Sequence, residues 1–492
     1  MRYHSFFPTA AALAIFFAAG SLAPTQTSAQ DTAAAAADNG STKPAGAMET
    51  STAKLSVKEV LIPERVTRVP ADNDYDNPES EFCHQRSKST ENFILFWAKE
   101  YGDDPLANET QNRRFDVDNI LKECERFYDY YVNTLKWVDK ETSLASRYKF
   151  LIYVIGGRGG TAFGGAIDNK VGAFWSPASR ISRPPYGVVA HELGHSFQAL
   201  LRADGAERFS GGSIHEMGAQ YMLWQVYPEW MTFENYHLND FMRATHLAFL
   251  HPDNQYHSCY PIEYWSNKHG VEFFGRMWRE VQRGEDPVMT YQRLTSISQE
   301  QFNDEMFDAC RRFVTWDMPR IEKVAARYAN QHTTTLNAAD DGWYQIAVEK
   351  CPQNYGYNAI QLKVPVAETK VSLDFKGVVG AEGFSSVQPE KAGWRYGFLA
   401  SKEDGSRVYS DVFSKSEGAA EFTVPADTKF LWLVVMGAPT EHWIHISARG
   451  RGRRGNAGGE RGGQTEPIAI SNEQWPYRIK LTGTAFGESV IE

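Results

Sequence analysis

Two histidines with an acid between them have the spacing of metal ligands on a helix. His191, Glu192 and His195 lie within residues 188–198, VVAHELGHSFQ. Residues four apart on an α-helix lie about 40° apart around its axis, so both imidazoles project from one face. A catalytic zinc ion takes three protein ligands and keeps a fourth position for water. The spacing therefore predicts a helix on which His191 and His195 bind Zn²⁺ and Glu192 acts as general base.

The residues around this motif also predict a helix. Val189, Leu193, Phe197 and Leu200 fall on the side opposite the histidines, which we expect to be buried. Gly194 stands in the helix interior, where glycine costs about 1 kcal/mol relative to alanine. We therefore expect another element to approach the helix closely at Gly194.

A third metal ligand must come from further along the chain. The candidates are Glu207, His215 and Glu216. Glu216 is favoured because it stands near the start of a second predicted helix, residues 213–227. On that helix, Ala219 is small enough for two helices to approach, and Gln220 can hydrogen-bond a ligating histidine. The alternative role for Glu216 is a capping box with Ser213, since S-x-x-E is its signature.

The H-E-x-x-H motif followed by a glutamate on the next helix resembles the gluzincin-type zinc metallopeptidases. The metzincin pattern is excluded, because Gln198 and Leu201 stand where it requires glycine and histidine. The chain is also similar to the enhancin-like branch and to an uncharacterised group of secreted bacterial proteins with a gluzincin core. The resemblance implies Glu216 as the third Zn²⁺ ligand. A G-A-M-E-N-like element is absent from the sequence, which argues against exopeptidase activity.

Peptide hydrolysis also needs a donor that stabilises the oxyanion of the transition state. Candidates after the second predicted helix are Tyr256, His257 and Tyr260. Tyr260 is favoured because it precedes a proline that begins a predicted helix. The alternative for each of the three is a ring that packs in the core.

These residues together predict a secreted zinc-dependent endopeptidase that hydrolyses peptide bonds with metal-activated water. Its expected partner is a protein or glycoprotein substrate. Two alternatives stay open: a glycoprotein-directed, mucinase-like protease, and a non-catalytic surface or carbohydrate-binding protein that retains a metal site. Glu192 favours catalysis, because a structural metal site has no use for a base beside it.

The amino-terminal residues predict export. Residues 1–29 combine Arg2, an apolar run and the small residues of a cleavage site, as a signal peptide does. Residues 30–55 predict a disordered linker. No later run reaches the roughly 18 apolar residues of a membrane span, so the expected localisation is secreted or periplasmic. The net charge of −10 argues against general nucleic-acid binding.

The cysteines leave two possibilities. The chain contains Cys83, Cys124, Cys259, Cys310 and Cys351. In an oxidising compartment they allow two disulfides and one free thiol, without fixing the pairing. The alternative is that they are buried free thiols.

Apolar periodicity predicts an α+β zincin-like catalytic domain over residues 56–335, followed by an all-β, jelly-roll-like sandwich over 336–492. Besides the motif helix, helices are expected at 115–137, 213–227, 270–282 and 298–316, and strands at 93–97, 148–155, 171–175, 359–364, 369–375, 430–435 and 477–481. The resemblance implies that strand 171–175 is the edge strand above the metal that pairs with the substrate backbone in zincin enzymes; the alternative is an ordinary strand of the sheet. The glycine-rich segment 156–165 is expected to be a loop or the rim of a hairpin, and 448–465 a disordered Arg/Gly loop.

Overall fold

The computed structural model describes residues 57–157, 160–230, 236–444, 473–488 and 490–491. The predicted signal peptide (1–29), linker (30–55) and Arg/Gly loop (448–465) lie outside the described residues. From Ser56 to Glu492 the chain forms one unit, and the domain boundary at 335/336 stays a prediction. In the part of the chain that the structure describes, no helix is both long and apolar enough to cross a membrane.

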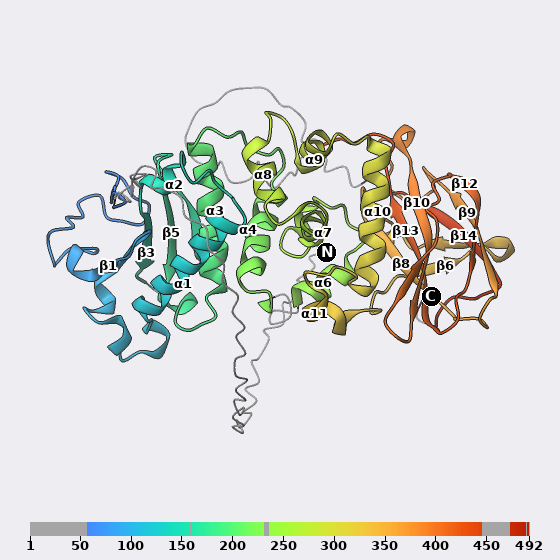
Figure 1. Cartoon of the computed structure of the whole chain (residues 1–492), viewed down its shortest axis with the longest axis horizontal. Helices are drawn as coiled ribbons and strands as arrows, with labels where there is room; N and C mark the ends of the chain where they lie inside the picture. Colours follow the sequence, from blue (N-terminus) through green and yellow to red (C-terminus); the bar gives the residue numbers. More distant parts are fainter. Residues whose placement is uncertain (1–56, 158–159, 231–235, 445–472, 489, 492) are drawn as a thin grey trace, which may run out of the picture. The chain divides into compact units, whose positions relative to one another are not determined.

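A five-stranded mixed sheet is formed by the strands nearest the amino-terminal end of the described chain (Figure 1). Its strands, in sheet order, are β1 (Ser87–Ser89), β2 (Phe93–Trp97), β3 (Phe150–Ile155), β5 (Val171–Pro177) and β4 (Phe163–Ile167). Strands β2, β3 and β5 are parallel, whereas β1 and β4 run antiparallel at the two edges. Every residue of β2 and β5 is buried, as expected for strands covered on both faces.

The helix that carries the motif lies directly on this sheet. The two helices nearest the sheet are α1 (Val117–Asp129) and α3 (Gly187–Ala203). Helix α3 contacts β4, β5 and α1, and Phe197 packs on Phe150 of β3 with ring centroids 5.0 Å apart. Val189, Leu193 and Leu200 are also buried. The predicted apolar face of the motif helix is therefore confirmed.

A helical layer connects this sheet to the carboxyl-terminal strands (Figure 1). Its helices are α4 (Ser213–Val226), α6 (Tyr236–Arg243), α7 (Tyr260–His269), α8 (Phe273–Glu280), α9 (Pro287–Thr295), α10 (Gln299–Thr315) and α11 (Glu322–Ala325), and a short α2 (Leu144–Arg147) precedes β3. Helix α4 packs along α3, and α10 contacts β8, β10 and β13. Helix α4 thus lies where it can complete a site on α3.

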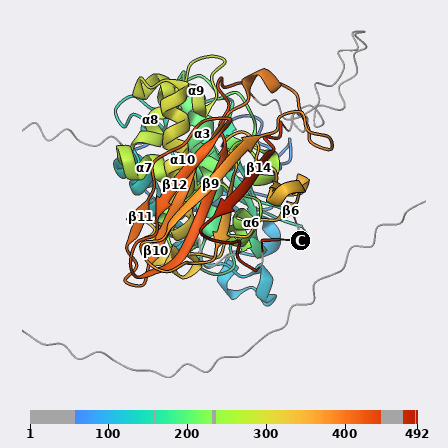
Figure 2. The same cartoon turned by 90° about the vertical axis from the view of Figure 1, so that its right-hand side faces the viewer.

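The carboxyl-terminal strands form two antiparallel sheets around a second apolar core. One sheet has the order β11 (Arg407–Tyr409), β10 (Trp394–Lys402), β13 (Thr428–Gly437) and β8 (Tyr357–Leu362). The other has the order β12 (Glu417–Thr423), β9 (Lys370–Gly377), β14 (Tyr477–Thr482), β7 (Tyr344–Ile346) and β6 (Leu336–Ala338). Figure 2 shows β12, β9 and β14 side by side. Phe375 of β9 stacks on Tyr396 of β10 across the core, with ring centroids 4.1 Å apart.

The structure confirms the coarse fold class, α+β with a β-sandwich, and most of the expected elements. Two details differ. Strand β5, which covers the expected edge strand 171–175, is internal, and the edge is β4. Strand β4 lies partly in the segment that we expected to be a loop or hairpin rim. All five cysteines are buried free thiols, which agrees with the second of the two possibilities above.

Candidate active site

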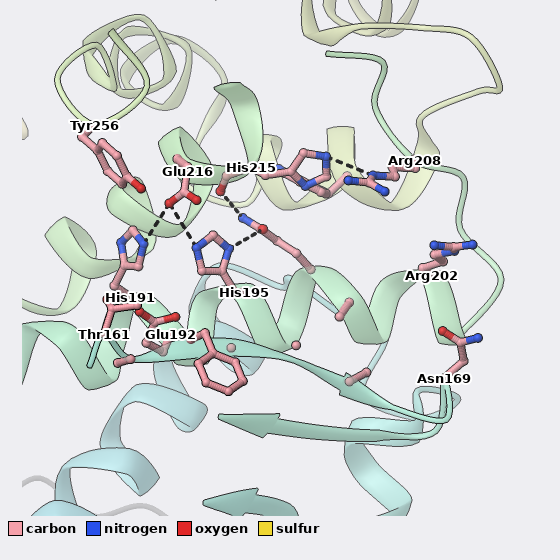
Figure 3. Close-up of a pocket in the computed structure, with 18 of the residues that line it drawn as sticks. Thr161, Asn169, His191, Glu192, His195, Arg202, Arg208, His215, Glu216 and Tyr256 are labelled. Carbon is pink, nitrogen blue, oxygen red and sulfur yellow. Dashed lines mark hydrogen bonds and ion pairs between the residues drawn. The ribbon is translucent and has the colours of Figure 1, made fainter. Parts of the chain in front are cut away.

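Helices α3 and α4 bring the three favoured metal ligands together (Figure 3). The Nε2 atoms of His191 and His195 each lie 3.2 Å from Oε2 of Glu216. Among the described residues, these three side chains form the one group of histidines, cysteines and acids whose ligand atoms all lie within 4.8 Å of one another.

The distances between these atoms fit a tetrahedral zinc ion. Ligand atoms about 2.0–2.1 Å from such an ion stand about 3.3 Å apart, close to the two distances of 3.2 Å. A charge-assisted N–H···O hydrogen bond is shorter, about 2.7–2.9 Å. Two imidazole nitrogens and one carboxylate oxygen are also a known donor set of catalytic zinc sites. The residues therefore fit the metal that the sequence predicts.

Two glutamines orient the imidazoles. Oε1 of Gln220 lies 3.2 Å from Nδ1 of His191, and Oε1 of Gln198 lies 3.1 Å from Nδ1 of His195. The Gln198 amide is held in this orientation because its Nε2 donates to the backbone carbonyl of His215, at 2.9 Å. An amide oxygen accepts a hydrogen bond, so the fixed Gln198 amide places the proton of His195 on Nδ1, and Nε2 of both histidines is directed at the Glu216 carboxylate.

The electrostatics favour positive charge between the three side chains. Burial disfavours ionisation of Glu216, but the neighbouring imidazoles of His191 and His195 lower its pKa well below the usual range. Burial also disfavours a charged His195, yet the Glu216 carboxylate raises the pKa of that histidine. An ionised carboxylate facing two imidazole nitrogens in a partly buried site favours a bound cation.

Small residues allow the close contacts that this geometry needs. A Cβ atom on Gly194 would lie 3.1 Å from Cα of Ala219, so α3 and α4 approach closely at this point. A Cβ atom on Gly164 of β4 would lie 2.0 Å from the backbone oxygen of Glu192. Gly194 and Ala219 confirm the predicted close approach, whereas the contact between β4 and α3 was not expected.

Glu192 lies beside the two imidazoles but outside the group of three ligand atoms (Figure 3). Its side chain is largely buried, and burial raises its pKa, while His191, His195 and the backbone N–H of Gly164 oppose the shift. A carboxylate with a raised pKa at this position has the properties of a general base.

A cavity of about 650 Å³ opens over the three side chains. Strand β4 forms one wall, and the cavity follows α3 from His191 to Arg202. A second cavity, of about 180 Å³, shares His191 and Glu192 with the first and continues past Val188 toward the start of α3. The open space therefore extends from the three side chains in both directions along the helix.

The structure does not place Tyr260 at this site. Its ring is fully buried against Trp224, Phe241 and Trp316, and it does not line the cavity. Tyr260 is therefore the packing aromatic that formed the alternative prediction. The reason is its position on the first turn of α7, which turns the ring toward the core.

Tyr256 lies at the site instead. It lines the cavity, its ring centroid is 6.2 Å from that of His191, and its hydroxyl points toward Glu216 (Figure 3). Burial, followed by the neighbouring Glu216, raises its pKa, so the phenol keeps its proton. The third candidate, His257, pairs with His237, with their Nδ1 atoms 2.9 Å apart, and does not line the cavity.

The other candidate ligands lie apart from the three-residue group. Nε2 of His215 accepts a hydrogen bond from Nε of Arg208 at 3.3 Å, and burial together with that cation lowers the pKa of His215 to about 3. Glu207 lines the far end of the cavity. The capping box is not formed, because Gly212 caps α4 without a side-chain hydrogen bond. Glu216 is thus left to face the histidines.

Sequence reasoning missed two residues of the site. Gln198 orients His195, and its position three residues after that histidine, on the same helical face, was the available signal. Gly164 sets the contact between β4 and α3, and a pair of glycines beside a predicted strand was a weaker signal.

A family model covers nearly the whole chain. The model of a family of unknown function, DUF6055, matches residues 52–488, and the chain belongs to that family. No curated protein matches the sequence.

Solved structures with detectable similarity include metallopeptidases and a carbohydrate-binding module. The ZmpB metallopeptidase from Clostridium perfringens has 13% identity and a TM-score of 0.29, over 70% of this chain and 69% of that one. The M60 catalytic domain of C. perfringens ZmpB with its CBM51-1 and CBM51-2 domains has 9% identity and a TM-score of 0.26, over 84% of this chain and 60% of that one. The family 22 carbohydrate-binding module of Clostridium thermocellum Xyn10B has 13% identity and a TM-score of 0.17, over 32% of this chain and 83% of that one. These scores are too low to assign a function, which we therefore infer from the site itself.

Proposed function

We propose that this protein is a secreted, zinc-dependent endopeptidase with a zincin-like catalytic domain. The observation that carries the proposal is the convergence of His191, His195 and Glu216 from two helices, with Glu192 beside them in an open cavity. A purely structural zinc site is usually closed by four protein ligands. Here three ligands and an adjacent buried acid match the requirements of hydrolysis.

His191, His195 and Glu216 are the residues that would hold the metal. When bound, Zn²⁺ supplies Lewis acidity, which polarises a carbonyl oxygen and lowers the pKa of water to about 7. Gln198 and Gln220 keep both Nε2 atoms turned toward Glu216. Such supporting hydrogen bonds orient the ligands and typically change metal affinity by about 10- to 100-fold.

Two further side chains perform the proton transfer and charge stabilisation. Glu192 accepts a proton from the attacking water and returns it to the leaving amine. The Tyr256 hydroxyl, held at the cavity wall with its proton in place, donates a hydrogen bond to the developing oxyanion. Tyr256 takes the role that sequence reasoning had favoured for Tyr260.

The shape of the site supports cleavage within a chain rather than at its end. The cavity and its smaller neighbour continue on both sides of Glu192, so a polypeptide can pass through. Strand β4 pairs with β5 on one side only, which leaves backbone donors and acceptors along the cavity wall. An extended substrate can add to this edge as another strand.

The test is metal content together with hydrolysis of a protein substrate by the full-length protein. We expect about one zinc ion per chain, cleavage of a denatured protein, and loss of cleavage with a chelator. Glu192→Gln is the matched variant, because it keeps all three ligands and should keep zinc while losing turnover by a factor of about 100 or more.

The alternatives give different results in the same experiment. Cleavage confined to glycosylated proteins would identify a glycoprotein-directed protease. A wild-type protein that binds zinc but cleaves neither kind of substrate would contradict the endopeptidase proposal and favour a binding protein.

A further inference from the structure

The end of the cavity beyond His195 carries two arginines, Arg202 and Arg208 (Figure 3). Arg202 follows His195 by seven residues on α3. Seven residues correspond to nearly two full turns, so Arg202 lies almost in line with His195 and about 10 Å further along the helix axis. The arginine is therefore on the same face of α3 as the metal ligands.

Arg208 is held over the same end of the cavity by His215, a half-buried ring that packs on the buried Trp278. Its Nε donates to Nε2 of His215 at 3.3 Å, and the His215 ring packs edge-on against Trp278, with ring centroids 5.2 Å apart. Because the contact uses only Nε, the terminal nitrogens of the guanidinium are left for another partner. His215 directly precedes Glu216 in the chain, so the backbone that positions the proposed ligand Glu216 also positions the partner of Arg208.

Neither arginine forms an ion pair with an acid in the described part of the chain. Other arginines do form such pairs, for example Arg293 with Glu285 at 2.6 Å and Arg312 with Asp308 at 2.8 Å. Glu207 lines the same end of the cavity but makes no ion pair with Arg202 or Arg208. Other exposed arginines also lack an acidic partner in the described residues, but Arg202 and Arg208 are the two arginines that line this cavity.

The wall opposite these arginines is backbone. Strand β4 runs along the cavity and leads toward Asn169, which lies beneath Arg202 (Figure 3). A peptide added to this edge advances about 3.3 Å per residue. Arg202 lies about 10 Å beyond His195 along the helix axis. That distance corresponds to about three residues of an extended substrate, counted from the bond that is cleaved.

We propose that Arg202 and Arg208 form a subsite for the carboxylate of an aspartate or glutamate about three residues from the scissile bond. Guanidinium groups bind carboxylates through paired N–H···O bonds, which are stronger than neutral hydrogen bonds. The proposal rests on the endopeptidase function above and names its substrate class: extended polypeptide segments with an acidic residue near the cleavage site. An acidic side chain of the substrate supplies the partner that the chain itself does not.

The test compares pairs of peptides that differ only by glutamate or glutamine, placed at each of four positions on either side of one cleavage site. We expect the zinc-supplemented wild-type protein to cleave one glutamate peptide about five- to tenfold faster than its glutamine partner, as kcat/KM. Arg202→Gln and Arg208→Gln should each reduce this ratio, and the double variant should bring it to about one. Arg243→Gln removes the same charge from α6, outside the cavity, and should leave the ratio unchanged.

Binding without turnover separates this inference from the proposed function. Glu192→Gln protein, titrated with the fluorescent glutamate and glutamine peptides, should bind the glutamate peptide several-fold more tightly. Adding Arg202→Gln in the same background should reduce the difference, and adding both Arg202→Gln and Arg208→Gln should abolish it. Equal kcat/KM values and equal affinities for both peptides at every position would overturn the subsite even if peptides are cleaved. Arginine-dependent binding of a sialylated or sulfated glycan, with no preference for the glutamate peptide, would overturn it as well.

Discussion

At the scale of single residues, Tyr256 and Tyr260 show how four positions separate a ring at the site from a ring in the core. The hydroxyl of Tyr256 faces Glu216 across the cavity. The hydroxyl of Tyr260 is buried and has no hydrogen-bond partner among the described residues. Removing the hydroxyl should therefore impair catalysis at Tyr256 and leave both catalysis and stability undiminished at Tyr260.

We expect Tyr256→Phe to lower kcat by a factor of about 100, because it removes one donor to the oxyanion. Tyr260→Phe should keep wild-type kcat and should not lower the unfolding temperature, since it removes a buried hydroxyl without a partner. Steady-state kinetics and thermal unfolding of both variants check this. Wild-type kcat in Tyr256→Phe would show that another group stabilises the oxyanion.

Gln220 is a residue whose effect should appear in zinc affinity. Gln220→Leu removes the acceptor of the His191 Nδ1 proton, and the imidazole then loses its fixed orientation. We expect zinc affinity, measured by competition with a chromophoric chelator, to fall about 10- to 100-fold. Gln345→Leu, on β7 of the sandwich, is the matched control. Equal affinity in the two variants would mean that packing alone orients His191.

At the scale of elements, the contact between β4 and α3 depends on a single hydrogen atom in place of a side chain. Gly164→Ala places a Cβ atom 2.0 Å from the backbone oxygen of Glu192, whereas Gly165→Ala meets nothing within 4 Å. We expect Gly164→Ala to destabilise the fold by about 2–4 kcal/mol, as overpacking against backbone does, and Gly165→Ala to stay close to wild type. Chemical denaturation of the two variants measures this difference, and similar unfolding free energies would show that β4 is not held tightly on the helix.

Helices and strands with a regular spacing of apolar residues could be predicted from the sequence. Apolar residues on one face predicted α3, and alternating apolar residues predicted β8, β9, β13 and β14. The same reasoning missed β4, because Phe163-Gly-Gly-Ala-Ile167 carries the glycines of a loop and almost none of the branched residues of a strand. Helix spacing predicted that His191 and His195 share a face, whereas the convergence of Glu216 with them was what the gluzincin resemblance implied. The choice among Tyr256, His257 and Tyr260 depended on side-chain directions in a connecting segment, where no periodicity applies.

At the scale of the whole molecule, a buried histidine links the helical layer to the sandwich. Nε2 of His332 lies 2.8 Å from the hydroxyl of Tyr357 on β8, and its ring lies 6.3 Å from that of Trp316. Burial lowers the pKa of His332 to about 3 from its ordinary value of 6.5. The folded protein therefore keeps this histidine neutral under conditions where the unfolded chain protonates it.

This linkage predicts a loss of stability on acidification. A histidine with a lowered folded-state pKa contributes its full stability above pH 6.5 and loses it as the pH falls from 6.5 toward 3, by about 1.4 kcal/mol per pH unit. The free energy of unfolding, measured with urea, should fall between pH 7.5 and pH 5.5 by about 1 kcal/mol less in His332→Gln than in wild type. His84→Gln, on the exposed η1 turn (His84–Arg86), should lose as much as wild type. Identical losses in all three proteins would exclude His332 as a source of the pH dependence.

The glycine contact between strand and helix also bears on catalytic accuracy. Main-chain atoms alone separate β4 from the turn of α3 that carries Glu192. Under the proposed function, a substrate aligned on that strand is positioned relative to the backbone of Glu192 through main-chain contact, and the Glu192 side chain supplies the only torsions between them. The spacing between the aligned backbone of such a substrate and the backbone of Glu192 should therefore vary little, whichever side chains the substrate brings.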